Sequence, residues 1–318
     1  MRDFTVLKKI SFCLSVAVLF FGRETSYAFE ITPVKQLFDI KQEFLQPTDV
    51  AVGKEYRIYV MDGVNNLVKV FDSNGVFIFT FGGKGTVQGM FDSPLGISTD
   101  SEGRVYVADT GNKRIQIFSP HGKFLSMFPV KQVDTPRPAD PVDIAIDDKR
   151  ERLYVVDNDN HNIKVYSLKD YRLLEQWASE GKRRQELKYP FLITTSNSLV
   201  YVVDVLNTRV QAFNPDGVSV SIIGNWGVDL GQLYRPKGVA VDEKGRIFVS
   251  DSYVGALQVF NRFGHFKSVV GNENGKVMKW ETPVGITIDD RMRLYVVQMF
   301  INQVSVYQIL DMKLEGRE

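Results

Sequence analysis

The sequence has few of the side chains that build metal centres or covalent cross-links. Its 318 residues include one cysteine, Cys13, and three histidines. A single cysteine cannot form an intrachain disulfide, so burial of apolar surface must stabilise the fold. His121, His161 and His265 stand at three different positions of the repeat described below, whereas a catalytic zinc site needs converging histidines. Gly-x-Ser-x-Gly and P-loop motifs are also missing.

An excess of charge of one sign is missing as well. Lysine and arginine together number 39, and aspartate and glutamate number 38. Binding to nucleic acid calls for a basic field on the protein surface. We therefore expect no nucleic acid among the partners of this chain.

Long apolar runs are absent too. Residues 10–21 are apolar, but a spanning helix needs roughly 20 such residues. This run follows Arg2, Lys8 and Lys9 and precedes the small-x-small pattern Ser26-Tyr27-Ala28. The order predicts a cleaved signal peptide over residues 1–28 and a mature chain, residues 29–318, that is periplasmic or extracellular. Without residues 1–28 the chain has no cysteine and carries 35 basic and 36 acidic residues.

What the sequence does contain is repetition. Six stretches are nearly the same: RIYVMD, RVYVAD, RLYVVD, LVYVVD, RIFVSD and RLYVVQ. Their last residues are 47 or 48 positions apart: Asp62, Asp109, Asp157, Asp204, Asp251 and Gln298. A regular period of this length indicates an array of structural repeats. We number these repeats copy 1 to copy 6.

Each copy has the pattern of four short strands. A proline opens the copy, and four apolar segments follow, separated by turns rich in Asp, Asn and Gly. Four antiparallel strands repeated six times predict an all-β, six-bladed β-propeller in one domain, with repeats over about residues 44–309. The sixth copy ends after its third strand. We therefore predict that an apolar N-terminal strand, residues 31–40, supplies the fourth strand of the last blade and closes the ring.

Two stretches resemble NHL repeats: VYVADTGNKRIQIF at residues 105–118 and GQLYRPKGVAVDEKGRIFVSD at residues 231–251. Copy 4 departs from the pattern because it lacks the Asp-x-x-Gly turn, and copy 6 has Gln298 in place of the aspartate. WD40 repeats are the nearest alternative, but their Gly-His and Trp-Asp pairs do not recur. The resemblance implies a six-bladed propeller that binds other proteins. Some NHL domains bind RNA, which export and near-neutral charge disfavour here.

Residues that break the repeat are candidates for function. Trp177 and Trp280 stand where other copies have apolar residues, so we expect both in the core. Trp226 stands where other copies have lysine or glutamate. We predict that Trp226 is an exposed anchor for a partner, with packing inside its own loop as the alternative. One basic cluster either steers an acidic partner or is simply solvated: Lys182, Arg183 and Arg184.

The repeated aspartates are predicted to be structural. An aspartate at the end of a strand accepts hydrogen bonds from loop N–H groups. Asp109 and Asp204 also each precede an arginine by five residues, Arg114 and Arg209. We expect these pairs to fix the loops without a ligand. A ring of metal-binding or catalytic aspartates is the weaker alternative.

Asp49 and Asp143 need a separate explanation. They lie two residues after the proline, where three other copies have glycine and copy 4 has Leu192. We place both carboxylates near the mouth of the central channel. They form a cation site, with calcium as the candidate, or a general acid/base pair, or they cap the local loop.

The sequence favours an exported propeller that acts as a protein-binding or scaffolding module, with no catalysis evident and no cofactor. We expect a monomer whose partner is another protein. The alternative is a calcium-dependent hydrolase or lyase with its site at the channel mouth. A receptor for small molecules or glycans ranks third. All three readings stay open at this point, because a fold alone does not fix a function.

Overall fold

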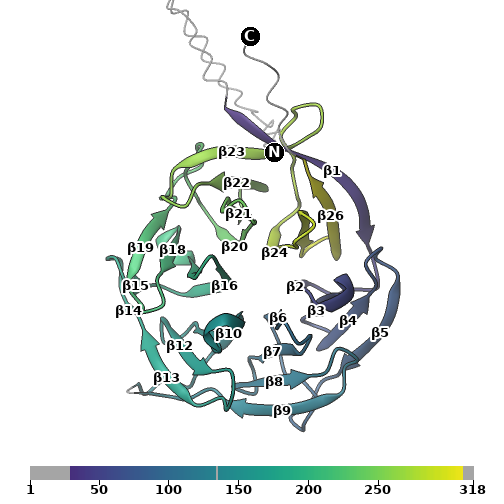
Figure 1. The fold of residues 1–318 in the computed structure, drawn as a ribbon, viewed down its shortest axis with the longest axis vertical. Coiled ribbons are helices and arrows are strands. Elements are labelled where there is room, and N and C mark those ends of the chain that lie inside the picture. The colour runs from purple at the N-terminus through teal and green to yellow at the C-terminus, as the bar shows by residue number, and fades with distance from the viewer. Residues whose placement is uncertain (1–28, 134, 311–318) are drawn as a thin grey trace, which may run out of the picture.

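The computed structural model describes residues 29–133 and 135–310, which form β-strands joined by turns and loops, with very little helix. The predicted signal peptide lies outside these residues. The sheets form a ring in which the first strand of each copy is innermost (Figure 1). Three 3-10 helices lie in loops: η1 (Lys54–Tyr56), η2 (Asp148–Arg150) and η3 (Val205–Asn207). No helix in the described part is long and apolar enough to cross a membrane.

Copies 1 to 4 each fold into a four-stranded antiparallel sheet. Copy 1 contains β2 (Pro47–Val52), β3 (Ile58–Asp62), β4 (Leu67–Phe71) and β5 (Phe77–Gly82). Copy 2 contains β6 (Ile97–Thr99), β7 (Val105–Asp109), β8 (Arg114–Phe118) and β9 (Phe124–Pro129). Copy 3 contains β10 (Pro141–Asp147), β11 (Arg152–Asp157), β12 (Asn162–Ser167) and β13 (Leu173–Trp177). Copy 4 contains β16 (Pro190–Ser196), β17 (Leu199–Asp204), β18 (Arg209–Phe213) and β19 (Ser219–Ile223).

Copies 5 and 6 share one eight-stranded sheet. Copy 5 contains β20 (Pro236–Val241), β21 (Ile247–Asp251), β22 (Ala256–Phe260) and β23 (Phe266–Asn272). Copy 6 contains β24 (Pro283–Ile288), β25 (Arg293–Gln298) and β26 (Gln303–Ile309). A short parallel pair precedes copy 4: β14 (Ser179–Glu180) and β15 (Glu186–Leu187).

The N-terminal strand β1 (Glu30–Ile40) completes copy 6, as the sequence predicts. It pairs antiparallel with β26, from Val34 opposite Ile309 to Ile40 opposite Val304. Its first half also pairs in parallel with β23, where Ile31 lies opposite Val269. This second pairing was not predicted. It joins copies 5 and 6, so that β23 and β26 both have their outer edges covered.

Position in the ring explains the sequence of each strand. The second strand of a copy, such as β7 with the sequence VYVAD, is buried along its whole length. Such continuous apolar runs are typical of strands covered on both faces. The fourth strand lies at the rim, and in β9 the more buried and the more exposed residues alternate. This alternation follows from the period of two in a strand that is covered on one face.

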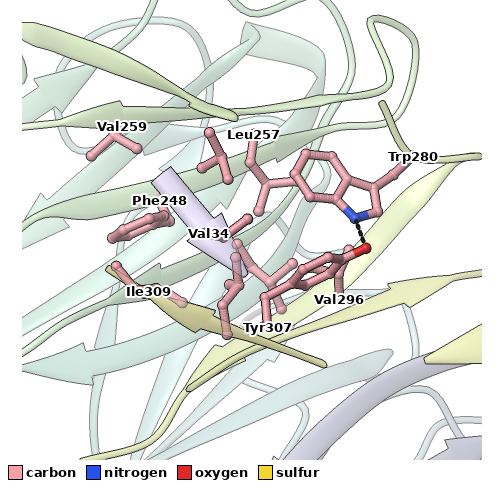
Figure 2. Packing of buried hydrophobic residues seen from close by; sticks show 12 residues of the cluster. Val34, Phe248, Leu257, Val259, Trp280, Val296, Tyr307 and Ile309 are labelled. Atoms are coloured by element: carbon pink, nitrogen blue, oxygen red, sulfur yellow. Dashed lines mark hydrogen bonds between the residues drawn. The ribbon is translucent and has the colours of Figure 1, made fainter. Parts of the chain in front are cut away.

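Apolar side chains fill the spaces between neighbouring sheets. Where copies 5 and 6 meet, Val34 of β1 packs in one cluster with Trp280 and Tyr307 (Figure 2). The indole Nε1 of Trp280 donates a hydrogen bond of 3.0 Å to the Tyr307 hydroxyl. Trp280 and Trp177 are each only 5% exposed. Both therefore belong to the core, as expected from their places in the repeat.

The aspartates that end the second strands tie loops to sheets. Arg114 Nε lies 2.7 Å from Asp109 Oδ2, and Arg209 Nε lies 2.8 Å from Asp204 Oδ2, so both expected ion pairs are present. Asp109 also accepts a 2.8 Å bond from the backbone N–H of Asp92, in the loop that enters its copy. These carboxylates are buried and are satisfied by the fold itself.

Candidate functional site

The channel contains two buried carboxylates. The first strands of the copies line a cavity of about 240 Å³, and Asp49 of β2 and Asp143 of β10 both face it. Asp49 Oδ2 accepts a hydrogen bond of 3.0 Å from the backbone N–H of Ile97 in copy 2. Asp143 Oδ2 accepts one of 2.8 Å from Ile193 N–H in copy 4. Each aspartate therefore links its own copy to the next, rather than capping a local loop.

The glycines at the equivalent positions make room for these carboxylates. A Cβ added at Gly285 would lie 2.5 Å from Asp49 Oδ1, and one added at Gly96 would lie 2.3 Å from Asp143 Oδ1. Such approaches are too close for any side chain. Aspartate in one copy and glycine in the copy before it are thus two halves of one contact. From the sequence, Asp49 and Asp143 looked like exceptions at a position that other copies fill with glycine. In the structure, each aspartate fits only because the copy before it has glycine at that position.

Burial controls the charge of this pair. It raises the pKa of Asp49 to about 7, although the bond from Ile97 N–H opposes the shift. Burial also raises the pKa of Asp143 well above its usual range, and the charge of Asp49 adds to that effect. Asp143 Oδ1 is buried without a hydrogen-bond partner. A carboxyl group with the pKa of Asp49 exchanges protons near neutral pH, which suits acid/base chemistry better than cation binding.

The described residues contain no group of three or more His, Cys, Asp or Glu placed to hold a metal ion. Asp49 and Asp143 are thus two acidic side chains without a third nearby. Calcium in proteins takes six to eight oxygen ligands, often several of them carboxylates. A calcium ion at this point would therefore have to draw most of its ligands from backbone carbonyls and water.

The loops at one end of the sheets form a second candidate region, which we call the loop face. It comprises the loops that follow the second strands and the loops that enter each copy, because antiparallel strands bring these to the same end. Trp226 lies here and is 69% exposed. The ring centroids of Trp226 and Tyr234 are 6.4 Å apart, and those of Tyr234 and Tyr253 are 4.2 Å apart. We call Trp226, Tyr234 and Tyr253 the aromatic row.

Exposed apolar residues continue around the loop face. They stand two positions after the Asp62, Asp204, Asp251 and Gln298 ends of the second strands, and we call them the apolar arc: Val64, Leu206, Tyr253 and Phe300. Copies 2 and 3 have Gly111 and Asp159 at this position. Copies 4, 5, 6 and 1 follow one another around the ring, so the four residues of the apolar arc come from four successive copies (Figure 1).

Sequence reasoning missed Tyr234, Tyr253 and Phe300. For Tyr253 and Phe300 the available signal was a comparison of the copies two residues after the second strand, where two copies have glycine or aspartate and four have apolar residues. A second indication is that these residues are large and exposed outside any strand. Neighbouring exposed rings such as those of the aromatic row are typical of interaction sites.

The basic cluster lies on the loop between β14 and β15. Lys182, Arg183 and Arg184 are exposed. Arg184 Nη1 donates a 2.9 Å hydrogen bond to the Ser219 carbonyl of β19, so this loop packs on copy 4. The loop of Trp226 packs on copy 5, where Gly231 N–H donates to Gln258 at 2.7 Å. The two loops thus cover consecutive copies of the ring.

The NHL repeat family matches the chain at residues 91–118, 139–166 and 233–260. Among curated proteins, the chain is similar to Protein brain tumor of Drosophila melanogaster, with 28% identity over 118 residues. The similar stretch covers 36% of this chain and 11% of the Drosophila protein. The chain therefore corresponds to a small part of that relative.

Several solved structures share the fold. A streptogramin B lyase has a TM-score of 0.62 at 10% identity, over 87% of this chain and 97% of its own. A gluconolactonase from Xanthomonas campestris has 0.64 at 14%, over 87% and 89%. A protein of unknown function from Bacteroides thetaiotaomicron has 0.64 at 18%, over 87% and 72%. These likenesses concern the fold alone: the chain has a β-propeller fold and contains three stretches that match the NHL repeat.

Proposed function

We propose that this chain is an exported, six-bladed propeller that binds another protein through its loop face. The count of six takes the eight-stranded sheet as two blades, copy 5 and copy 6 with β1, joined by the β1–β23 pairing. Export rests on the signal-peptide pattern of residues 1–28.

The aromatic row carries this proposal. Tryptophan and tyrosine are enriched among residues that dominate binding energy, because they bury a large rigid surface and keep a polar edge. A monomeric protein rarely exposes such rings together without a use for them. The apolar arc extends the row over four copies, and a broad surface of this kind suits a protein better than a small ligand.

The test compares two exposed aromatic residues at opposite ends of the sheets. Phe263 is 62% exposed and lies in the hairpin between β22 and β23, away from the loop face. The partner would be captured from periplasmic extract with the full chain, identified, and titrated against each variant. Trp226→Ala should weaken binding by roughly 2 kcal/mol or more, whereas Phe263→Ala should not. If both variants bind as the wild type does, the loop face is not the interface.

Channel chemistry is the second candidate function. It is favoured by Asp49 and Asp143, two buried carboxyl groups with raised pKa values in one cavity. Propellers of similar fold include a lyase and a gluconolactonase. A bound cation would raise stability by mass action. Melting with calcium and with chelator should differ in the wild type but not in Asp49→Asn/Asp143→Asn if calcium binds here. Equal melting of the wild type under both conditions removes the calcium form of this candidate.

A further inference from the structure

A second cavity, of about 320 Å³, opens on the loop face where copies 4, 5 and 6 meet. We call it the cationic pocket. Six of its lining residues matter here: Phe191, Arg235, Lys237, Ser252, Thr282 and Phe300. Its volume lies at the lower end of the range for ligand pockets, roughly 300–1,000 Å³.

Two cations lie in this pocket without an acidic partner. Neither Arg235 nor Lys237 forms an ion pair with any described residue. Lys237 Nζ instead lies 4.9 Å from the centre of the Phe191 ring. Burial lowers the pKa of Lys237, and the charge of Arg235 lowers it further. Arg235 is exposed and Lys237 is half-buried, and both differ from the buried Arg114 and Arg209, which each face an aspartate.

The repeat shows that Lys237 is out of place structurally. It directly follows the proline that opens copy 5. The other copies have threonine or an apolar residue at this position: Thr48, Leu95, Val142, Phe191 and Val284. The fold therefore does not need a charge here. Placing one partly out of water beside a second cation costs free energy. The contact with the Phe191 ring offsets part of that cost, but no described acidic residue pairs with the lysine.

The walls of the pocket suit an anion carried on an apolar body. Arg235 and Lys237 supply charged donors for the two oxygens of a carboxylate, and such charge-assisted bonds are the strong ones. Ser252 holds the backbone in place, since its hydroxyl donates a 3.1 Å bond to the Arg235 carbonyl. Phe191 and Phe300 offer apolar contacts. The combination fits a carboxylate better than a free inorganic anion, which would not use the aromatic walls.

Two residues of the aromatic row are sequence neighbours of residues that line the pocket. Tyr234 directly precedes Arg235, and Tyr253 directly follows Ser252. A chain segment that placed a carboxylate in the pocket would therefore pass next to both tyrosines. We propose that the cationic pocket binds the side-chain carboxylate of an acidic residue in the protein partner, with the apolar residues beside it lying on Phe300 and the aromatic row. This inference rests on the proposed function, because it names the chemistry of the partner segment.

The test uses two synthetic peptides that differ in one charge. Acetyl-Phe-Asp-Phe-amide and acetyl-Phe-Asn-Phe-amide would be titrated into the full chain at low salt and followed by calorimetry. We expect the Asp peptide to bind roughly tenfold more tightly, the effect of one net charged hydrogen bond. Arg235→Met and Lys237→Met should each reduce its affinity towards that of the Asn peptide. The matched control Lys123→Met removes an exposed lysine from a hairpin away from the loop face and should change nothing.

Three results would overturn the proposal: equal affinity of the two peptides, no binding of either at millimolar concentration, or full affinity in Lys237→Met that still melts as the wild type does. Phenylacetate, titrated in parallel, tests for a free acid as the source of the carboxylate. Phenylacetate that binds as tightly as the Asp peptide would show that flanking residues contribute nothing, against the peptide assignment.

These results separate the pocket from the broader function. If Trp226→Ala weakens partner capture while the two peptides bind alike, only the pocket assignment fails. If the Asp peptide is preferred while Trp226→Ala leaves partner capture intact, the loop-face interface fails and the pocket remains a carboxylate site.

Discussion

A single missing Cβ decides where this chain can bury a carboxyl group. Asp49 and Asp143 occupy space that Gly285 and Gly96 leave open, and both reach across to the next copy. Burial without a cation favours the neutral acid, which is why the pKa of Asp49 rises to about 7. Between about pH 4, the usual range of an aspartate, and this value, the folded chain keeps a proton that the unfolded chain has lost. The contribution of Asp49 to stability is therefore greatest at low pH and falls as pH rises.

Asp49→Asn should remove this dependence. Asparagine keeps the shape and can still accept the Ile97 N–H bond, but it does not titrate. The free energy of unfolding of the variant, relative to wild type, should rise as pH goes from about 4 to above 7, by about 1.4 kcal/mol for each unit of the pKa shift. Urea unfolding at several pH values measures it. Asp216→Asn, at an exposed hairpin residue, is the control. A parallel pH dependence in wild type and Asp49→Asn would contradict the raised pKa.

The glycine side of the contact gives an independent prediction. Gly285→Ala places a methyl group 2.5 Å from Asp49 Oδ1 and 2.8 Å from the Thr48 carbonyl. The backbone of Thr48 cannot move away from the added methyl group easily, so we expect a loss of about 1–3 kcal/mol in stability. Because Gly275 has no atom within 4 Å of the added position, Gly275→Ala adds only the strain of its φ of 76°. A smaller loss in Gly285→Ala than in Gly275→Ala would refute the packing argument.

At the level of strands, internal repetition was enough to predict most of the fold. The period, the four strands per copy and the role of residues 31–40 all follow from apolar segments that recur at fixed spacing. The parallel pairing of β1 with β23 does not, since it depends on how copies 5 and 6 meet in space. The Asp–Gly contacts were misread for the same reason. Comparing copies shows which residues are equivalent, but it does not show which of them touch across two copies.

Removing β1 should damage the whole ring. A chain without residues 30–40 loses the partners of β23 and β26 and the core contacts of Val34 and Ile40. We expect loss of cooperative unfolding and aggregation through the open edges, measured by thermal melting and gel filtration. Val34→Asp should act in the same direction, while Leu37→Asp, at an exposed site of the same strand, should not. A deletion variant that stays monomeric and melts with the wild type would disprove closure by β1.

Considered as a whole, the molecule has two unlike faces. The aromatic row, the apolar arc and the cationic pocket all lie on the loop face. Among the described residues, the hairpins of the opposite face expose three large apolar side chains, Val76, Val218 and Phe263, one in each of three hairpins. Trp226 was found from the sequence because it is an aromatic residue at a position where other copies have lysine or glutamate. The pocket was not, because its residues come from three copies and become a site only when those copies are adjacent.

This asymmetry predicts how a partner approaches. The exposed side chains of Lys182 and Arg183 lie on the loop over copy 4, beside the copy that bears the aromatic row. Charges at the edge of an interface act mainly on the rate of encounter and are screened by salt over a Debye length of about 10 Å at 0.1 M. Lys182→Ser/Arg183→Ser should therefore slow association with an acidic partner at low salt and change dissociation little, as measured by surface plasmon resonance. Arg184 is left intact, because its bond to the Ser219 carbonyl holds the loop. Trp226→Ala should instead speed dissociation at every salt concentration, because the variant lacks the ring that the wild type buries in the bound complex. An association rate that is unchanged in the double variant at low salt would show that this basic loop does not steer the partner.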